Sequence, residues 1–292
     1  MKQSLSPKNL AMAIGVSESS LKRWADSGRI EVSRTVGGHR KIAFNEAIRF
    51  IRDAEMTVVR PEILGIPELK ETATSLKRSD EDPALVLEKL LSEGAAPQAR
   101  GVIIGLYMSG SSVAEICDGP ISHAMGKIGS IWQHSDEGIF IEHRATEICA
   151  QAINQLRLLL EPASETSRNL PVAVGGCPSG DYGALASMMV AVTLLECGYE
   201  AVNLGANTPM VSMLNAVQQY RPKLTYMACT HSGFLPARVE LDQLSNAMSE
   251  LQGCVVLGGH AAERAYSAIE GNIYLHNSMT ALSGFARGLI AT

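Results

Sequence analysis

The chain has 292 residues, of which 46% are hydrophobic and 19% are charged, as is usual for a protein that folds around its own core. This length predicts two or three domains. No apolar run reaches the ~18 residues that a membrane-spanning helix needs, and the N-terminus lacks the apolar core of a secretory signal. We therefore expect a cytoplasmic protein without a membrane partner. The six cysteines form no CxxC pairs, which favours buried thiols over a zinc site.

Charge is distributed unevenly along the chain. Residues 1–60 carry 11 Lys and Arg against 6 Asp and Glu, a net charge of +5, whereas the rest carries 14 against 24, a net charge of −10. A small basic part on an acidic body indicates a polyanion-binding head followed by a separate sensor or assembly module. We expect four parts: the head at 1–60, a linker at 61–80, a helical bundle at 81–162 and an α/β domain at 168–292.

Two short helices are predicted at the start of the head. Ser6 caps the first helix, and Pro7 occupies its first position. Gly15 ends that helix, and Ser17 caps the second. This is the spacing of a helix-turn-helix, in which the second helix enters the DNA major groove. The side chains expected to face inward are Leu10, Ala13, Ile14, Leu21 and Trp24.

A tight hairpin is predicted after these helices. Two adjacent glycines stand between β-prone flanks in "RTVGGHRKIAF". Cationic and polar side chains surround the turn and are suited to phosphate oxygens and base edges. Together with the exposed side of the second helix they form the predicted DNA-binding set: Lys22, Arg23, Arg34, Thr35, Gly37, Gly38, His39, Arg40 and Lys41.

The stretch from Leu5 to about Asp53 resembles the winged DNA-binding domain of MerR-type transcriptional regulators. The motifs "LKRWADSGRI", "RTVGGHR" and "FNEAIRFI" carry the likeness. The resemblance implies a regulator that binds promoter DNA as a dimer or higher oligomer. Metal-sensing members follow the head with a long dimerisation helix and a cysteine-bearing loop. This chain has neither, so metal sensing is not expected.

The middle of the chain has a helical period of apolar residues from about 83 to 160. We expect Trp132 to close one helix, and Glu142 with His143 to open the next. Taken singly, each of these residues also fits an ordinary core or surface position. The interruptions that predict about four helices, the usual number in a small bundle, are Gly94, Gly110, Gly119 and Gly138.

The pattern Trp-x9-Glu-His looks like the signature of the four-helix cap in cobalamin-dependent light-sensing MerR regulators, the CarH/LitR type. In that family the Trp and Glu contact the adenosyl group above the corrin ring. The His can bind cobalt once light has expelled that group. The resemblance implies these roles for Trp132, Glu142 and His143, with His143 as the metal ligand.

The last third alternates five short buried-type strands with helix-length segments. The strands lie in "PVAVGGC", "EAVNLG", "LTYMACT", "CVVLGG" and "NIYLH". This alternation predicts a five-stranded parallel sheet with helices on both faces. Loops at the carboxyl ends of such strands line a ligand crevice. The predicted ligand-binding residues there are Ser179, Gly180, Asp181, Tyr182, Gly183, Thr230, His231, Ser232, Gly258, Gly259 and His260, with Asn207 and residues 276–278 on the same side.

This third resembles the flavodoxin-like cobalamin-binding domain that follows the cap in the same family. There, the loop after the first strand has the pattern Asp/Glu-x-His-x-x-Gly, and its His ligates cobalt from below. Aligning the glycine with Gly183 places Gly180 where the His belongs, so the usual ligand is absent. His231, after the third strand, is the candidate replacement. The implied cofactor is cobalamin in its adenosyl form. The alternatives are haem, a bilin, a small metabolite, or no ligand in a module that serves only oligomerisation.

An enzyme is not expected. Corrinoid mutases and methyltransferases use the same sheet, but they need the ligating His and a catalytic partner domain. No Ser-His-Asp, P-loop or paired-carboxylate pattern stands out. The sequence therefore predicts a nucleoid-associated repressor with three folded parts: a helical winged head, a four-helix bundle and a flavodoxin-like α/β domain. We expect it to act as a homodimer or homotetramer.

Overall fold

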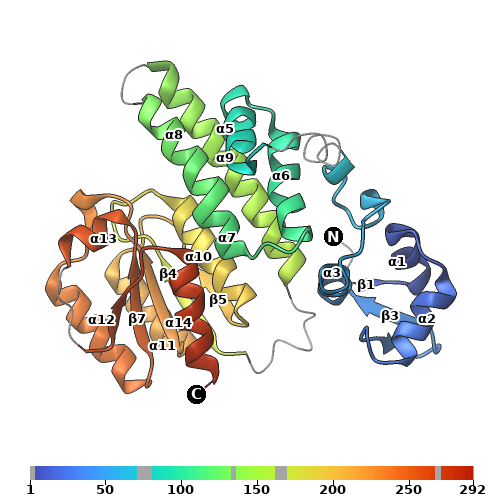
Figure 1. The fold of residues 1–292 in the computed structure, drawn as a ribbon. Helices are drawn as coiled ribbons and strands as arrows, with labels where there is room; N and C mark the ends of the chain where they lie inside the picture. Colours follow the sequence, from blue (N-terminus) through green and yellow to red (C-terminus); the bar gives the residue numbers. More distant parts are fainter. Residues whose placement is uncertain (1–3, 71–80, 133–135, 162–169, 267–270, 292) are drawn as a thin grey trace. The chain divides into compact units, whose positions relative to one another are not determined.

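The computed structural model describes residues 4–70, 81–132, 136–161, 170–266 and 271–291 (Figure 1). Contacts between residues divide the chain into two compact units. The first comprises Met1–Ser112 and Gly119–Arg168, and the second comprises Val113–Asp118 and Asn169–Thr292. None of the described helices is long and apolar enough to cross a membrane.

The first unit begins with a head in which helices pack on an antiparallel sheet of order β1-β3-β2. Ser6 accepts a hydrogen bond from the N–H of Asn9, and Ser17 accepts one from the N–H of Ser20, which confirms both predicted caps. Gly15, at φ +70°, ends the first helix as expected. The elements of the head are β1 (Ser4–Leu5), α1 (Pro7–Ile14), α2 (Glu18–Asp26), β2 (Ser33–Arg34), β3 (Arg40–Ala43) and α3 (Phe44–Asp53).

The core of the head follows the predicted inward pattern except at Trp24. That ring is half-buried and packs against Phe50, with 5.4 Å between the ring centroids and 45° between the ring planes. The expected linker also departs from the prediction, because its first part packs on the head. Leu64 and Ile66 are buried beside a 3-10 helix, η1 (Pro61–Ile63). Residues 71–80, the rest of that segment, lie outside the described residues.

Helices pack together in the rest of the first unit. Gly94 and Gly110 end helices as predicted. Gly119 and Gly138 do not interrupt helices, because one lies in a π-helix and the other in the first turn of α9. The helices of this part are α5 (Pro83–Glu93), α6 (Ala96–Met108), α8 (Ser122–Trp132) and α9 (Asp136–Leu160). Between α6 and α8 the chain forms a short helix, α7 (Val113–Ile116), which belongs to the second unit, and the π-helix η2 (Cys117–Ile121).

The second unit contains the predicted parallel sheet, with strand order β5-β4-β6-β7-β8. All four pairings between neighbouring strands are parallel. The order reverses at β4, so the loops after β4 and β6 face one crevice. All five strands fall within the quoted sequence stretches: β4 (Val172–Gly176), β5 (Glu200–Asn203), β6 (Leu224–Ala228), β7 (Cys254–Gly258) and β8 (Ile273–Leu275).

Helices cover both faces of this sheet, and each face has its own apolar core. One core joins the sheet to α10 and α14 through residues such as Leu194, Tyr226 and Leu282. The other joins it to α11, α12 and α13. The helices are α10 (Ala184–Glu196), α11 (Met210–Tyr220), α12 (Arg238–Glu250), α13 (His260–Ala265) and α14 (Met279–Ala291), with a 3-10 helix η4 (Ser232–Phe234) after β6.

Candidate functional site

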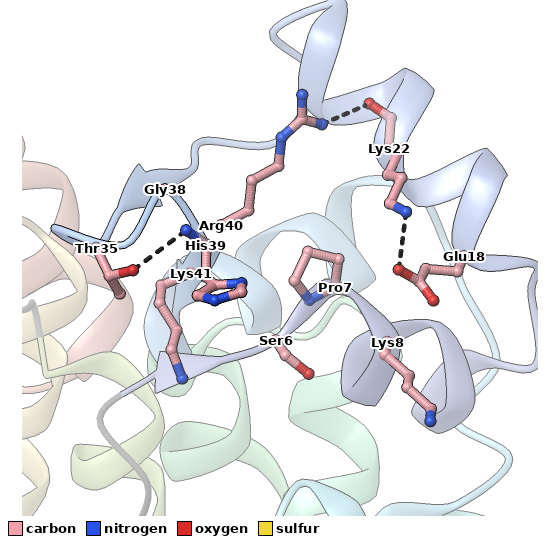
Figure 2. Close-up of a pocket in the computed structure, with 10 residues that line it drawn as sticks. All are labelled: Ser6, Pro7, Lys8, Glu18, Lys22, Thr35, Gly38, His39, Arg40 and Lys41. Atoms are coloured by element: carbon pink, nitrogen blue, oxygen red, sulfur yellow. Dashed lines mark hydrogen bonds and ion pairs between the residues drawn. The ribbon is translucent and has the colours of Figure 1, made fainter.

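A groove of about 670 Å³ lies on the surface of the head, between the start of α1, the side of α2 and the β2–β3 hairpin (Figure 2). Four of its ten lining residues are Lys or Arg, and only one is acidic. A concave surface of this charge attracts an extended polyanion. The lining residues are Ser6, Pro7, Lys8, Glu18, Lys22, Thr35, Gly38, His39, Arg40 and Lys41.

The turn of the hairpin is held by hydrogen bonds between its own residues. The N–H of His39 donates to the hydroxyl of Thr35 at 3.2 Å, and the N–H of Thr35 donates to the carbonyl of His39 at 2.9 Å. Gly38 has φ +78°, a conformation that glycine adopts without the steric cost of a Cβ. The tight turn leaves the edge of the hairpin exposed to solvent.

The cations of the groove differ in how they are paired. Lys22 Nζ lies 3.0 Å from Glu18, and Arg40 lies 2.5 Å from Asp26. Among the described residues, no ion pair holds Lys8 or Lys41. In Figure 2 no dashed line joins either of these side chains to another residue drawn there. The groove therefore offers two free ammonium groups and two cations that are already paired.

Six of the predicted DNA-binding residues line the groove: Lys22, Thr35, Gly38, His39, Arg40 and Lys41. Arg23, Arg34 and Gly37 lie outside the lining and are exposed. Sequence reasoning did not assign Lys8 or Glu18 to the site. Lys8 follows the proline that starts α1, and a cation in this first turn was the sequence signal that could have placed it at the groove. Glu18 precedes Lys22 by four residues, the spacing of a helical ion pair.

The second candidate site lies at the carboxyl ends of β4 and β6, and Asp181 is its centre. The side chain is 1% exposed. Its carboxylate accepts hydrogen bonds from the N–H groups of Thr230 (2.6 Å), His231 (3.1 Å) and Gly183 (2.9 Å). The hydroxyl of Thr230 donates a fourth at 2.6 Å. The structure thus brings these predicted residues together, but they bond to one another.

Phe234 lies against Gly180, the position where the resemblance stated above would place a histidine. Gly180 has φ +83°, and a Cβ built on it would lie 2.3 Å from the Phe234 ring. The N–H of Gly180 donates to Asn207 at 2.7 Å. A side chain at position 180 would need the ring to move and would also have to adopt a left-handed backbone.

His231 is poorly arranged to replace the missing ligand. Its Nδ1 accepts a hydrogen bond from the N–H of Gly233 at 3.0 Å. In a neutral imidazole, an accepting Nδ1 requires the proton to be on Nε2. An Nε2 that carries a proton has no lone pair for a metal. The thiol of Cys177 offers no substitute, because burial raises its pKa to about 11 and it donates to the carbonyl of Gly183.

The other predicted residues of this edge vary in exposure. Tyr182 is 75% exposed, and Ser179 and His260 are exposed as well. Ser232 is the first residue of η4. Gly259 makes a close backbone approach, because a Cβ there would lie 2.2 Å from the carbonyl oxygen of Cys229. A Cβ on Gly258 would lie 2.8 Å from the carbonyl oxygen of residue 276.

The three signature residues of the bundle lie at the α8–α9 connection. Trp132 is the last residue of α8, as expected, but its side chain lies outside the described part. Glu142 and His143 do not open α9, because the helix begins at Asp136 and places them in its second turn. Glu142 accepts a hydrogen bond from Thr146 at 2.9 Å and lies 3.6 Å from His143, whose side chain is 75% exposed.

No three-residue metal cluster of His, Cys, Asp or Glu exists within the described ranges. The prediction of buried thiols is confirmed, since all six cysteines are free and buried. The metal role of His143 stays a prediction. Its described acidic neighbour is Glu142.

Comparisons with known proteins give one whole-chain likeness. No family model matches. The chain is 24% identical over 273 residues to the HTH-type transcriptional repressor CarA of Myxococcus xanthus, covering 90% of this chain and 88% of that protein. The resemblance to a transcriptional regulator expected from the sequence is thereby confirmed over most of the chain.

Solved structures with a partial likeness include the Methanosarcina barkeri monomethylamine corrinoid protein, with TM-score 0.49, 12% identity, and 70% of this chain and 96% of that chain covered. A cobalamin-binding protein from Desulfitobacterium hafniense has TM-score 0.34 and 16% identity, with 70% and 97% covered. Likenesses of this size identify neither a ligand nor a reaction.

Proposed function

We propose that this chain is a sequence-specific DNA-binding transcriptional regulator that represses its target promoters. The observation that carries the proposal is the open cationic groove of the head, built from two capped helices and a hairpin. The likeness to a transcriptional repressor over 90% of the chain supports it. The acidic remainder of the chain is the control module.

The head acts as a winged helix-turn-helix. Helix α2 enters the major groove and presents Lys22 and Arg23, both of which are exposed. The hairpin lies along the phosphate backbone, where Arg34 and Lys41 supply charge and the imidazole of His39 supplies a hydrogen-bonding group. Thr35 orders the turn through its bonds to His39. Gly37 and Gly38 carry no side chain, so the DNA backbone can approach the turn closely.

The experiment that tests this function selects duplexes from a pool of random sequence with the full-length protein. Binding of the selected duplex is then measured over a salt series and compared with an unselected duplex. A specific regulator prefers the selected duplex by roughly a thousandfold or more, and log affinity falls with log salt by ~0.9 per phosphate contact. A pool that yields no preferred sequence, with affinity independent of salt, would contradict the proposal.

The control module senses a corrinoid in the first candidate mechanism. In that mechanism Trp132, Glu142 and His143 of the bundle would hold the ligand. The carboxyl edge of the sheet does not fit a cobalt held by a protein histidine, because Phe234 lies against Gly180 and the Nδ1 of His231 accepts a hydrogen bond from a backbone N–H. We therefore derive no step of control through a bond between this edge and cobalt.

In the second candidate mechanism the α/β part works without a ligand and supports homo-oligomerisation. The closed hydrogen-bonding of Asp181 favours it, since the loop donors that would hold an anionic ligand are already satisfied. In both mechanisms a homodimer or homotetramer binds the promoter, and oligomer size sets DNA affinity.

Gel filtration with light scattering separates these two candidates. The purified protein is run in the dark with and without adenosylcobalamin, and its absorption spectrum is recorded. A red species that elutes with the protein, and a change of mass on illumination, supports the sensing mechanism. A colourless protein with unchanged mass and unchanged DNA affinity supports the ligand-free mechanism.

A further inference from the structure

Arg40 is the most engaged cation of the groove. Its Nη2 lies 2.5 Å from Asp26 Oδ1, and its Nη1 donates to the carbonyl of Lys22 at 3.4 Å. The side chain is only 22% exposed. Figure 2 shows its guanidinium bonded to the backbone of Lys22. Both partners belong to α2, whereas Arg40 is the first residue of strand β3. One guanidinium therefore connects the hairpin to the helix expected to enter the major groove.

The position of Asp26 indicates that this connection is needed. Asp26 is the last residue of α2, where the helix dipole disfavours a carboxylate. An adjacent guanidinium offsets that cost. A carboxylate beside a DNA-binding helix also repels phosphate unless a cation neutralises it. Asp26 is therefore unfavourable both for the end of α2 and for DNA binding, and the ion pair with Arg40 offsets both effects.

Arg34 provides an internal contrast. It pairs with Arg40 across the hairpin in the register of β2 and β3, so the two side chains leave the same face. Among the described residues no ion pair holds Arg34, and it is exposed. Two arginines thus stand opposite each other, one free for a phosphate and the other bound to α2.

We infer that Arg40 is a positioning residue, which fixes the angle between the hairpin and α2 through Asp26, and that it makes no phosphate contact. This inference rests on the proposed DNA-binding function, and it revises the role that the sequence suggested for Arg40. It places phosphate binding on Arg34 and the free lysines. It also makes Asp26, an acidic residue, necessary for tight DNA binding.

Four full-length variants test the inference: Asp26→Asn, Arg40→Gln, the double variant, and Arg34→Gln as the matched control. Each is measured with the selected duplex over a salt series, and circular dichroism confirms that each is folded. We expect Asp26→Asn and Arg40→Gln each to weaken binding three- to tenfold without a change of salt slope. We expect the double variant to bind DNA as tightly as the single variant with the lower affinity, because both substitutions break the same interaction. Arg34→Gln weakens binding and lowers the slope by ~0.9.

The direction in which Asp26→Asn changes DNA affinity separates the two possible roles of Arg40. If Arg40 instead contacts a phosphate, Asp26→Asn frees it and tightens binding, and Arg40→Gln lowers the salt slope, which overturns the inference. Unchanged DNA affinity in both Asp26→Asn and Arg40→Gln also overturns the inference, because the ion pair would then have no effect on DNA binding. Unchanged affinity and salt slope in Arg34→Gln also overturn the inference, because phosphate binding would then not lie on Arg34. A random pool that yields no preferred duplex would instead remove the proposed DNA-binding function itself.

Discussion

The groove of the head and the carboxyl edge of the parallel sheet use polar groups in opposite ways. In the groove, Lys8 and Lys41 have no ion-pair partner among the described residues, and the lining is open to solvent. At the edge, Asp181 is 1% exposed and takes four hydrogen bonds from the loops around it. The groove therefore has free cations that can bind an external anion, whereas the donors at the sheet edge already bind the carboxylate of Asp181. Of these two described sites, the groove of the head is the one that can bind an anionic partner without rearrangement.

Removing the internal anion gives the largest expected effect. Asp181→Ala leaves four donors without their acceptor, and we expect the free energy of unfolding to fall by about 3 kcal/mol. Urea denaturation followed by circular dichroism measures the change. Asp242→Ala is the control, because Asp242 is half exposed and its ion pair among the described residues is a surface pair with Arg238. This substitution changes stability by less than about 0.5 kcal/mol. Equal stability of the two variants would show that the edge is not held by Asp181.

A side chain at position 180 tests whether Phe234 closes the edge. Gly180 and Gly205 both have φ +83°, but a Cβ on Gly205 meets no atom within 4 Å. We expect Gly205→Ala to cost about 1 kcal/mol from backbone strain alone and Gly180→Ala to cost about 2 kcal/mol. Adding Phe234→Ala to Gly180→Ala should remove the steric part of that difference. Equal melting curves for the two single variants would mean that the ring yields freely.

Removing a free cation tests the open groove. We expect Lys8→Gln to weaken DNA binding about fivefold and to lower the salt slope by ~0.9, because one phosphate contact is lost. Gel shifts over a salt series measure both quantities. Lys127→Gln, at an exposed position of α8, makes the same charge change away from the groove and leaves both quantities unaltered. Identical shifts for the two variants would assign the effect to total charge.

The smallest effect is expected from the acidic member of the groove. Glu18→Gln releases Lys22, which lies 3.0 Å from the carboxylate, and both side chains are about half exposed. Exposed pairs contribute little, so we expect DNA binding to tighten by only about two- to threefold. Fluorescence anisotropy with the selected duplex resolves a change of this size. Weaker binding would show that Glu18 orients Lys22 productively.

Local features were the predictable part of this molecule. The caps at Ser6 and Ser17 follow from rules that act within one helical turn, and the five strands follow from short apolar runs between turn signals. The start of α9 was misplaced because Gly138 was taken as an interruption. A glycine is tolerated in a helix when neighbouring residues favour it.

Contacts between distant residues could not be predicted in the same way. Arg40 and Asp26 are 14 residues apart, and Asp181 and Thr230 are 49 apart. The residue types can be read from the sequence, but the ion pair between Arg40 and Asp26 cannot. Arg40 was therefore predicted to be a free DNA-binding cation. The overlap of Phe234 with Gly180 depends on the path of a loop after another strand, which no periodicity encodes.

The short helix α7 has a practical consequence for dividing the chain. Asp118, just beyond α7, accepts hydrogen bonds from the N–H groups of Met279 and Thr280 at the start of α14. Glu196, the last residue of α10, accepts one from the N–H of Val113. In a truncated protein that begins near residue 168, the start of α14 and the end of α10 would lose these hydrogen-bond partners. Residues 113–118 thus belong to the sheet unit although some fifty residues separate them in the chain, and a fragment meant to fold by itself should retain them.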